Sequence, residues 1–300
     1  MSVVLSGLPL YVEQRRLPLI KEAVLKAKTA ELFSLQSDIK TSAALNLLST
    51  DVVFGDGLTC GWDEKGTNTL SQRILNTGHI KINMSFCEKD FLKYWTGYEV
   101  RVAAGQKNLP FEEYFTSSIV DNVKAAVEKA IWQGDTASSD LNLKWFDGML
   151  KILGEADGVV EPEIAEGSTA YDAIKAVYLA IPEKVLDKAV IFCGADTFRQ
   201  YMQEMVEKNY YHYAANGMPV EEFIVPGSNT RVIAVNGLNG TNKIVAGALD
   251  NLFYGCDMMG DDEKFEMWYS QDFRQFRLAI EFNAGVQTAF PNEVVMGTIA

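Results

Sequence analysis

The sequence predicts an α+β fold in which a small α/β unit is joined to long extensions. Three observations predict this fold: one long helical stretch, one protruding β-ribbon and a C-terminal region of alternating strands. With 300 residues the chain can bury a core without disulfides or a structural metal. Its 48% apolar and 22% charged residues are typical of a globular protein.

The long helix is predicted over residues 110–133. Pro110 suits a first helical position, and Gly134 is a typical C-terminal stop. Between them Phe115, Ile119 and Val123 follow the 3.6-residue period of a helix with one apolar face. Such a helix is roughly 35 Å long, which is unusual for a chain of this size.

Residues 1–50 form an arm that needs another surface to lie against. Residues 17–33 have helical spacing, but the segment is too short to form a core of its own. The arm carries six basic and four acidic side chains, whereas the whole chain has a net charge of −13. Its basic residues, including Arg15 and Arg16, either touch an acidic partner or form a solvated helix face.

A β-ribbon follows the arm. Residues 41–57 are rich in small and β-branched residues, and residues 79–86 alternate between apolar and polar. These two segments are predicted to pair, with a charged tip near Lys65 between them. An isolated two-stranded ribbon is marginally stable in water, so a partner surface is implied.

The rest of the chain predicts a small mixed α/β unit and a returning hairpin. Ser168 or Thr169 caps the first helix of this unit and Asp196 the second. The carboxylates of residues 155–166 are expected in a solvated loop. The expected elements are helices at 169–181 and 196–208, strands at 188–193, 223–225, 231–235 and 243–248, and a hairpin of 265–269 with 276–282.

The sequence is poor in catalytic parts. It lacks phosphate-binding glycine loops, zinc-type cysteine spacing and a nucleophile elbow, and its two histidines, His79 and His212, are not expected to be catalytic. Cys60 and Cys87 are expected to be buried reduced thiols. We therefore predict no catalytic, cofactor or metal residue.

Composition excludes further classes of protein. A pI of about 4.7 disfavours a dedicated nucleic-acid binder. No apolar run approaches the ~20 residues of a membrane span, and no signal peptide is evident. We expect a protein made in a cytoplasm that does not contact membranes.

Several segments resemble the major capsid proteins of tailed bacteriophages, whose fold encapsulins share. AAVEKAIWQGD at 125–135 and FDGML at 146–150 resemble the end of the family's spine helix and the element after it. NLFYGCDM, KFEMWYSQDF and FNAGVQTAFPNEVV within 251–295 resemble the closing strands. The specificity of the resemblance comes from the order and spacing of these segments along nearly the whole chain.

The resemblance implies a domain plan. It names residues 1–50 the N-terminal arm, 51–92 the extended E-loop and 162–260 the axial domain. Residues 93–161 and 261–300 become the peripheral domain with its spine helix.

The implied function is self-assembly into hexamers and pentamers that form an icosahedral shell around packaged double-stranded DNA. The implied partners are further copies of the chain, a portal and a separate scaffolding protein, with DNA enclosed but not read by sequence. The implied location is the virion, assembled in the host cytoplasm.

Function would then reside in surfaces. The candidate assembly residues are Trp62, Asp63, Glu64 and Lys65 at the ribbon tip, Arg15 and Arg16 in the arm, and Asn236 and Asn239 in a loop expected at the capsomer centre. Trp132 is expected in the core. A covalent cross-link between Lys65 and Asn292 is not expected, since most relatives lack that chemistry.

Two other functions remain open at this stage. An encapsulin-type nanocompartment shell would share the fold and enclose an enzyme. A soluble α/β enzyme with an unrecognised site would instead show a discrete small oligomer and one deep pocket.

Overall fold

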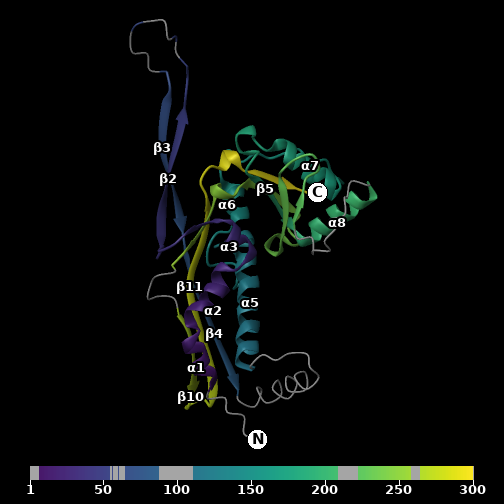
Figure 1. Ribbon diagram of the computed structural model, residues 1–300. Coiled ribbons are helices and arrows are strands. Elements are labelled where there is room, and N and C mark those ends of the chain that lie inside the picture. The colour runs from purple at the N-terminus through teal and green to yellow at the C-terminus, as the bar shows by residue number, and fades with distance from the viewer. Residues whose placement is uncertain are drawn as a thin grey trace.

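The chain is an elongated molecule with an α/β unit on one side and a hairpin projecting from one end (Figure 1). The computed structural model describes residues 7–54, 56, 60, 65–87, 111–208, 222–257 and 264–299. The helices are α1 (Gly7–Gln14), α2 (Arg16–Leu25), α3 (Lys28–Leu32), α5 (Phe111–Gln133), α6 (Met149–Glu155), α7 (Ala170–Ala180) and α8 (Ala195–Glu207), with short 3₁₀ turns η1 (Glu183–Val185), η2 (Asn236–Leu238), η3 (Leu249–Asn251) and η4 (Pro291–Glu293).

In the part of the chain that the structure describes, the strands form two five-stranded sheets and one separate hairpin. The strands are β1 (Ser34–Gln36), β2 (Ser42–Asp51), β3 (Thr67–Asn76), β4 (Gly78–Cys87), β5 (Ala189–Gly194), β6 (Glu222–Ile224), β7 (Arg231–Val235), β8 (Lys243–Ala248), β9 (Leu252–Cys256), β10 (Lys264–Ser270), β11 (Gln275–Thr288) and β12 (Val295–Thr298).

The long strand β11 organises the first sheet. It pairs antiparallel with β10 and β4 along its first half and with β9 along its second, and β1 adds to β9 in parallel. Phe276, Leu278 and Ile280 are buried, while the alternate residues are partly exposed. The predicted pairing of 265–269 with 276–282 is confirmed.

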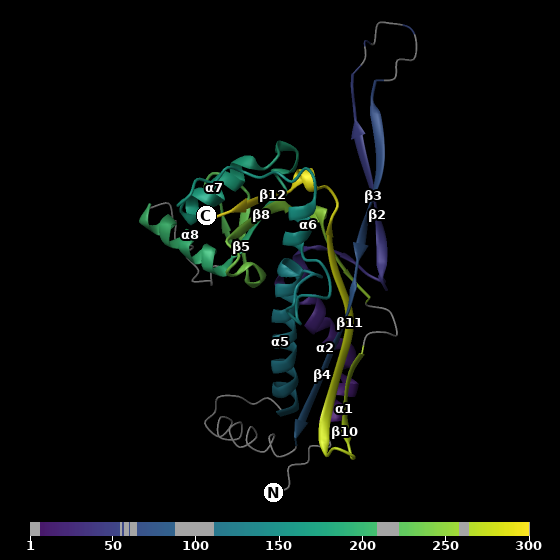
Figure 2. The same cartoon turned by 180° about the vertical axis from the view of Figure 1, so that it is seen from behind.

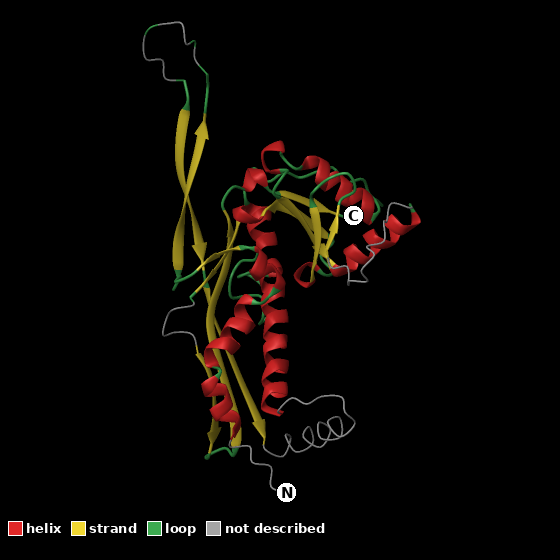
Figure 3. Cartoon of the chain, in the orientation of Figure 1, coloured by secondary structure: helices red, strands yellow, loops and turns green. Residues whose placement is uncertain are grey.

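The long helix α5 lies beside this sheet, as Figures 2 and 3 show. Its 23 residues confirm the helix predicted over 110–133. The buried row of Ile119, Val123 and Val127 follows the predicted period. The predicted core position of Trp132 is also confirmed, since its side chain is fully buried.

The arm packs against β10 and α5, but it is not the single helix predicted over 17–33. The helix breaks at Ala27, whose backbone is extended (φ −64°, ψ 134°). Ala27 is itself buried, and the break turns α3 so that Thr29 and Ala30 pack inward. The arm also ends earlier than residue 50, because β2 already belongs to the hairpin.

The predicted pairing of 41–57 with 79–86 is wrong. β2 pairs with β3, from Ser42 opposite Asn76 to Asp51 opposite Thr67. The chain leaves the hairpin at Thr77, and β4 joins β11 instead, which gives its alternating apolar residues a place beside the core. A Cβ on Gly78 would lie 2.0 Å from the carbonyl oxygen of Trp145, so this crossing requires glycine.

The second sheet has the strand order β12-β8-β5-β7-β6, and α7 and α8 pack against one of its faces. Thr169 caps α7 by accepting a hydrogen bond from the amide of Asp172, as predicted. Asp196 does not cap α8, because Gly194 occupies that position. Asp196 instead accepts a hydrogen bond from the amide of Gly240 at 2.8 Å.

Two strands cross the expected domain limits. β9 falls within 162–260 but pairs in the first sheet, where Tyr254 is fully buried. β12 falls within 261–300 but pairs with β8 in the second sheet, where Val295 joins the core beneath α7. Each strand pairs in the sheet whose core buries its apolar side chains.

Candidate assembly surfaces

The β2–β3 hairpin has one buried root and one exposed apolar face. At the root, Leu45, Leu47 and Leu75 pack with Ile39 and Ala289 in a small core of their own. The amide of Gln287 on β11 also donates a hydrogen bond to the carbonyl of Ile74 at 2.8 Å. The hairpin is therefore held at its base, and its outer half projects beyond the body (Figure 1).

The opposite face of the hairpin carries large apolar side chains in solvent. Leu48 and Leu70 stand directly opposite each other, and Ile74 lies further toward the root on the same face. Their side chains are 60%, 81% and 57% exposed. Beyond β2, Phe54 is 93% exposed. We call Leu48, Leu70 and Ile74 the hairpin apolar face; the hydrogen-bonded polar pair Asn46–Gln72 lies between Ile74 and the two leucines on this face. Large apolar side chains held in solvent in this way mark an interaction site.

Comparisons with known proteins come from structure, because no family model and no curated protein sequence matches the chain. A chain of the satellite phage P4 procapsid, a particle that includes the size-determination (Sid) protein, matches with a TM-score of 0.64 at 11% identity, covering 96% of this chain and 90% of that one. A chain from the capsid of an empty GTA particle gives 0.57 at 12% identity, covering 93% and 90%.

A virus-like particle from Pyrococcus furiosus gives 0.53 at 8% identity, covering 94% and 97%. These matches span nearly the full length of both partners. The chain has the phage capsid fold. The domain plan that the resemblance implies stays a prediction; we use its names and call the β2–β3 hairpin the E-loop, α5 the spine helix, and the second sheet with α7 and α8 the axial unit.

The candidate residues at the E-loop tip are only partly within the described structure. Lys65 is exposed, just before β3. Trp62, Asp63 and Glu64 lie outside the described residues. In the arm, Arg15 is exposed, with its guanidinium 5.5 Å from the ring centre of Tyr11, and Arg16 begins α2.

The loop that carries Asn236 and Asn239, expected at the capsomer centre, is exposed at these two residues and also has contacts within the subunit. The side chain of Gln133 donates to the carbonyl of Gly237 at 2.6 Å, and the amide of Ala195 donates to Asn239 at 2.7 Å. Asn236 begins the same η2 turn. A Cβ on Gly237 would lie 2.3 Å from the Trp132 ring, so the loop fits closely against the spine helix. These contacts make the loop a joint between the axial unit and the spine helix.

A buried polar cluster ties the arm to the spine helix, and the sequence did not predict it. The amide and hydroxyl of Thr29 both donate to the carboxylate of Glu128, the amide at 2.9 Å, and the indole of Trp132 donates to the Thr29 hydroxyl at 2.8 Å. Glu128 is only 5% exposed, and burial raises the pKa of its carboxyl. A threonine and a glutamate 99 positions apart carry no local signal of this contact.

The described residues provide few groups suited to catalysis. Within them, no group of three histidine, cysteine or acidic side chains could hold a metal ion, and no helix is long and apolar enough to cross a membrane. His79 is exposed on β4, and His212 lies outside the described residues. The prediction that Cys60 and Cys87 are buried is wrong: both thiols are free and exposed, because the hairpin end and the end of β4 lie away from the cores.

Proposed function

We propose that this chain is the major capsid protein of a tailed phage. It assembles through hexamers and pentamers into an icosahedral shell around packaged double-stranded DNA, and it acts as a structural component of the virion. The likeness to capsid particles along more than nine tenths of the chain supports this proposal.

The observation that carries the proposal is the hairpin apolar face. Leu48 and Leu70 project from a hairpin whose shared core with its own subunit lies at the root. A lone subunit gains nothing from holding these side chains in water, whereas a neighbouring copy can cover them. The tip residues Trp62, Asp63, Glu64 and Lys65 extend the same contact.

The charge distribution is consistent with a container wall. The chain carries a net charge of −13. An acidic wall repels the phosphate backbone, so it does not bind tightly the DNA that must enter and leave. The exposed Arg15 and the neighbouring Arg16 fit contact with a separate scaffolding protein. A portal would complete the shell, and assembly in the host cytoplasm follows from the same proposal.

A second candidate is a nanocompartment shell that encloses a protein, supported by the match to the virus-like particle from Pyrococcus furiosus. Negative-stain electron microscopy of the protein expressed alone tests both candidates. Closed shells or five- and six-membered rings are expected. Nucleic acid inside favours the genome shell, and a protein cargo favours the nanocompartment. Only compact monomers or dimers, with or without added scaffold, would contradict both.

A further inference from the structure

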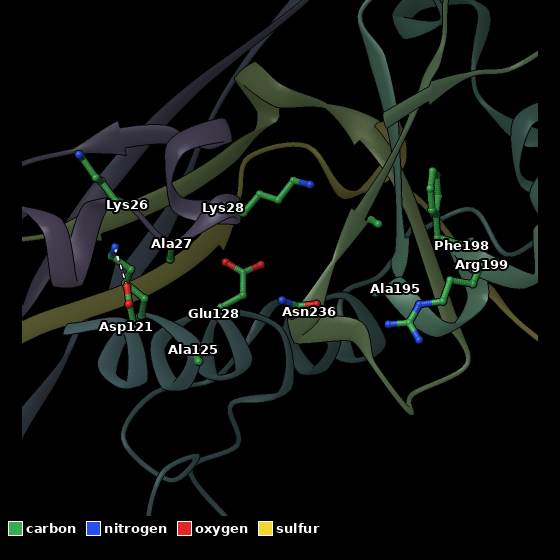
Figure 4. Close-up of a pocket in the computed structure, with 12 residues that line it drawn as sticks. Lys26, Ala27, Lys28, Asp121, Ala125, Glu128, Ala195, Phe198, Arg199 and Asn236 are labelled. Atoms are coloured by element: carbon green, nitrogen blue, oxygen red, sulfur yellow. Dashed lines mark hydrogen bonds and ion pairs between the residues drawn. The ribbon is translucent and has the colours of Figure 1, made fainter. Parts of the chain in front are cut away.

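A cavity of about 420 Å³ opens where the arm, the spine helix and the axial unit meet. Figure 4 shows Glu128 between the arm turn that carries Lys26 and Lys28 and the axial residues Asn236 and Arg199. Four cations line this cavity, from three separate parts of the fold: Lys26, Lys28, Lys124 and Arg199.

Carboxylates of the same subunit accompany two of these cations. The ammonium nitrogen of Lys124 lies 3.2 Å from a carboxylate oxygen of Glu22 and 3.3 Å from one of Asp121. Lys28 is close enough to Glu128 to oppose the rise in that carboxyl's pKa. Lys26 and Arg199, on opposite walls, are exposed and form no ion pair with any described residue. The cavity therefore keeps an excess of positive charge on two sides.

At the β12 edge of the axial sheet, an extended segment presents carboxylates outward. Val160 pairs with β12 through hydrogen bonds of 3.0 and 2.9 Å, so the segment adds to the sheet edge. Pro162 and Ile164 face inward, close to Gly297. The alternate residues Glu161 and Glu163 are exposed, with Cα atoms about 7 Å apart in an extended chain.

A cation beside this edge, Lys243, donates to the Thr298 hydroxyl of β12 at 2.7 Å and forms no ion pair with the edge carboxylates. Residues 152–174 contain no lysine or arginine, and Glu161 and Glu163 form no ion pair with any described residue. The segment is thus a preformed acidic edge, because Val160 is hydrogen-bonded beside β12 and the side chains of Val160 and Ile164 are already packed on the core. Because the segment is already ordered, it loses little conformational entropy when a partner binds.

We infer that the cavity at Lys26 and Arg199 receives the Glu161–Glu163 edge of a second copy of this chain. The two surfaces carry opposite charge and lie at different places on the axial unit, the cavity past the ends of β5 and β7 and the acidic segment beside β12, as a head-to-tail contact between copies requires. Repeated around an axis, such a heterologous contact closes a ring. The inference rests on the proposed function and names the surfaces that join neighbouring axial units.

A charge exchange tests the contact. The pair Lys26→Glu with Arg199→Glu, or the pair Glu161→Lys with Glu163→Lys, is expected to raise the protein concentration at half-assembly at least tenfold at low ionic strength. All four substitutions in one chain should return it to within about threefold of the original, since the opposite signs are restored. Sedimentation velocity measures the assembled fraction, and thermal unfolding checks that each variant folds.

A matched control changes charge elsewhere. Glu207→Lys with Asp272→Lys makes the same change as the acidic-edge variant, at two exposed positions outside both surfaces, and should leave the half-assembly concentration within threefold. The inference would be overturned if the variant with all four substitutions does not recover the original half-assembly concentration, or if this control loses assembly to the same extent. Loss in the cavity variant alone would also overturn it, because the cavity would then take a different acidic partner.

Zero-length carbodiimide coupling separates this inference from the proposed function. Particles assembled from mixed isotope-labelled and unlabelled copies should yield intermolecular links between Lys26 or Lys28 and Glu161 or Glu163. Particles that lack these links overturn the inference and leave the shell function standing. Absence of both particles and links from the original chain overturns the two together.

Discussion

Replacing Leu48 and Leu70 by asparagine should block assembly without unfolding the subunit. Full burial of a leucine side chain contributes about 2 kcal/mol. With 60% and 81% of these two side chains exposed, a neighbour can still gain about 3 kcal/mol per hairpin from covering them. At about 1.4 kcal/mol per decade, the loss weakens each contact roughly a hundredfold.

The assay is sedimentation velocity over a range of protein concentrations. The concentration at half-assembly should rise about a hundredfold, because every subunit of a shell repeats the weakened contact. The free energy of unfolding of the isolated subunit should change by less than about 0.5 kcal/mol, since both side chains are exposed there.

Ser49 and Thr69 provide the matched control. They form the next pair of the same two strands and are exposed on the opposite face. Replacing both by asparagine should leave assembly unchanged. Normal assembly of the Leu48→Asn/Leu70→Asn variant, or an equal defect in the control, would refute the reasoning that the apolar face makes the contact.

Three further predictions concern the subunit itself. Gly237→Ala should destabilise it by about 1–3 kcal/mol in urea denaturation, because the new Cβ would lie 2.3 Å from the Trp132 ring, whereas Gly154→Ala, with open space around it in α6, should be neutral or stabilising. Leu75→Ala should cost about 2–5 kcal/mol and speed proteolysis of the hairpin, since Leu75 is fully buried at its root; unchanged cleavage would contradict that role. Burial raises the pKa of Glu128, so the native state holds this proton more tightly than the unfolded state, and its contribution to stability falls as the pH rises from the unfolded value near 4.5 through the folded pKa. Glu128→Gln should remove that pH dependence. If the free energy of unfolding changes equally with pH in the two proteins from pH 5 to 7.5, this role of Glu128 is contradicted.

Much of the fold could be predicted because local patterns decide it. The spine helix has an uninterrupted apolar period, a proline before it and a glycine after it. From Gln275 to Phe282, β11 alternates regularly between buried and partly exposed residues, so one face of this part is buried. The capped helix α7 and the buried strand β5 likewise depend on residues that are close together in the sequence.

The remaining features depend on contacts between distant residues. β4 has the same alternation whether it pairs with β2 or with β11, and only the core beside β11, almost 200 positions away, decides between them. The exposed leucines of the hairpin are ordinary strand residues in the sequence, and their exposure follows from where the strands end up. The arm helix breaks at Ala27, and the break places Thr29 where it hydrogen-bonds to Glu128 on α5, far away in the sequence.

The placement of β12 has a consequence for the timing of synthesis. β8, at residues 243–248, stays without its outer neighbour until residues 295–298 have been translated, and the core beneath α7 stays open until Val295 arrives. A nascent chain therefore cannot finish its axial unit before residues 295–298 have been made. The edge that carries Glu161 and Glu163 is also anchored beside β12, through Val160. In the contact inferred above, a chain that stops before β12 therefore lacks the surface that joins it to another copy.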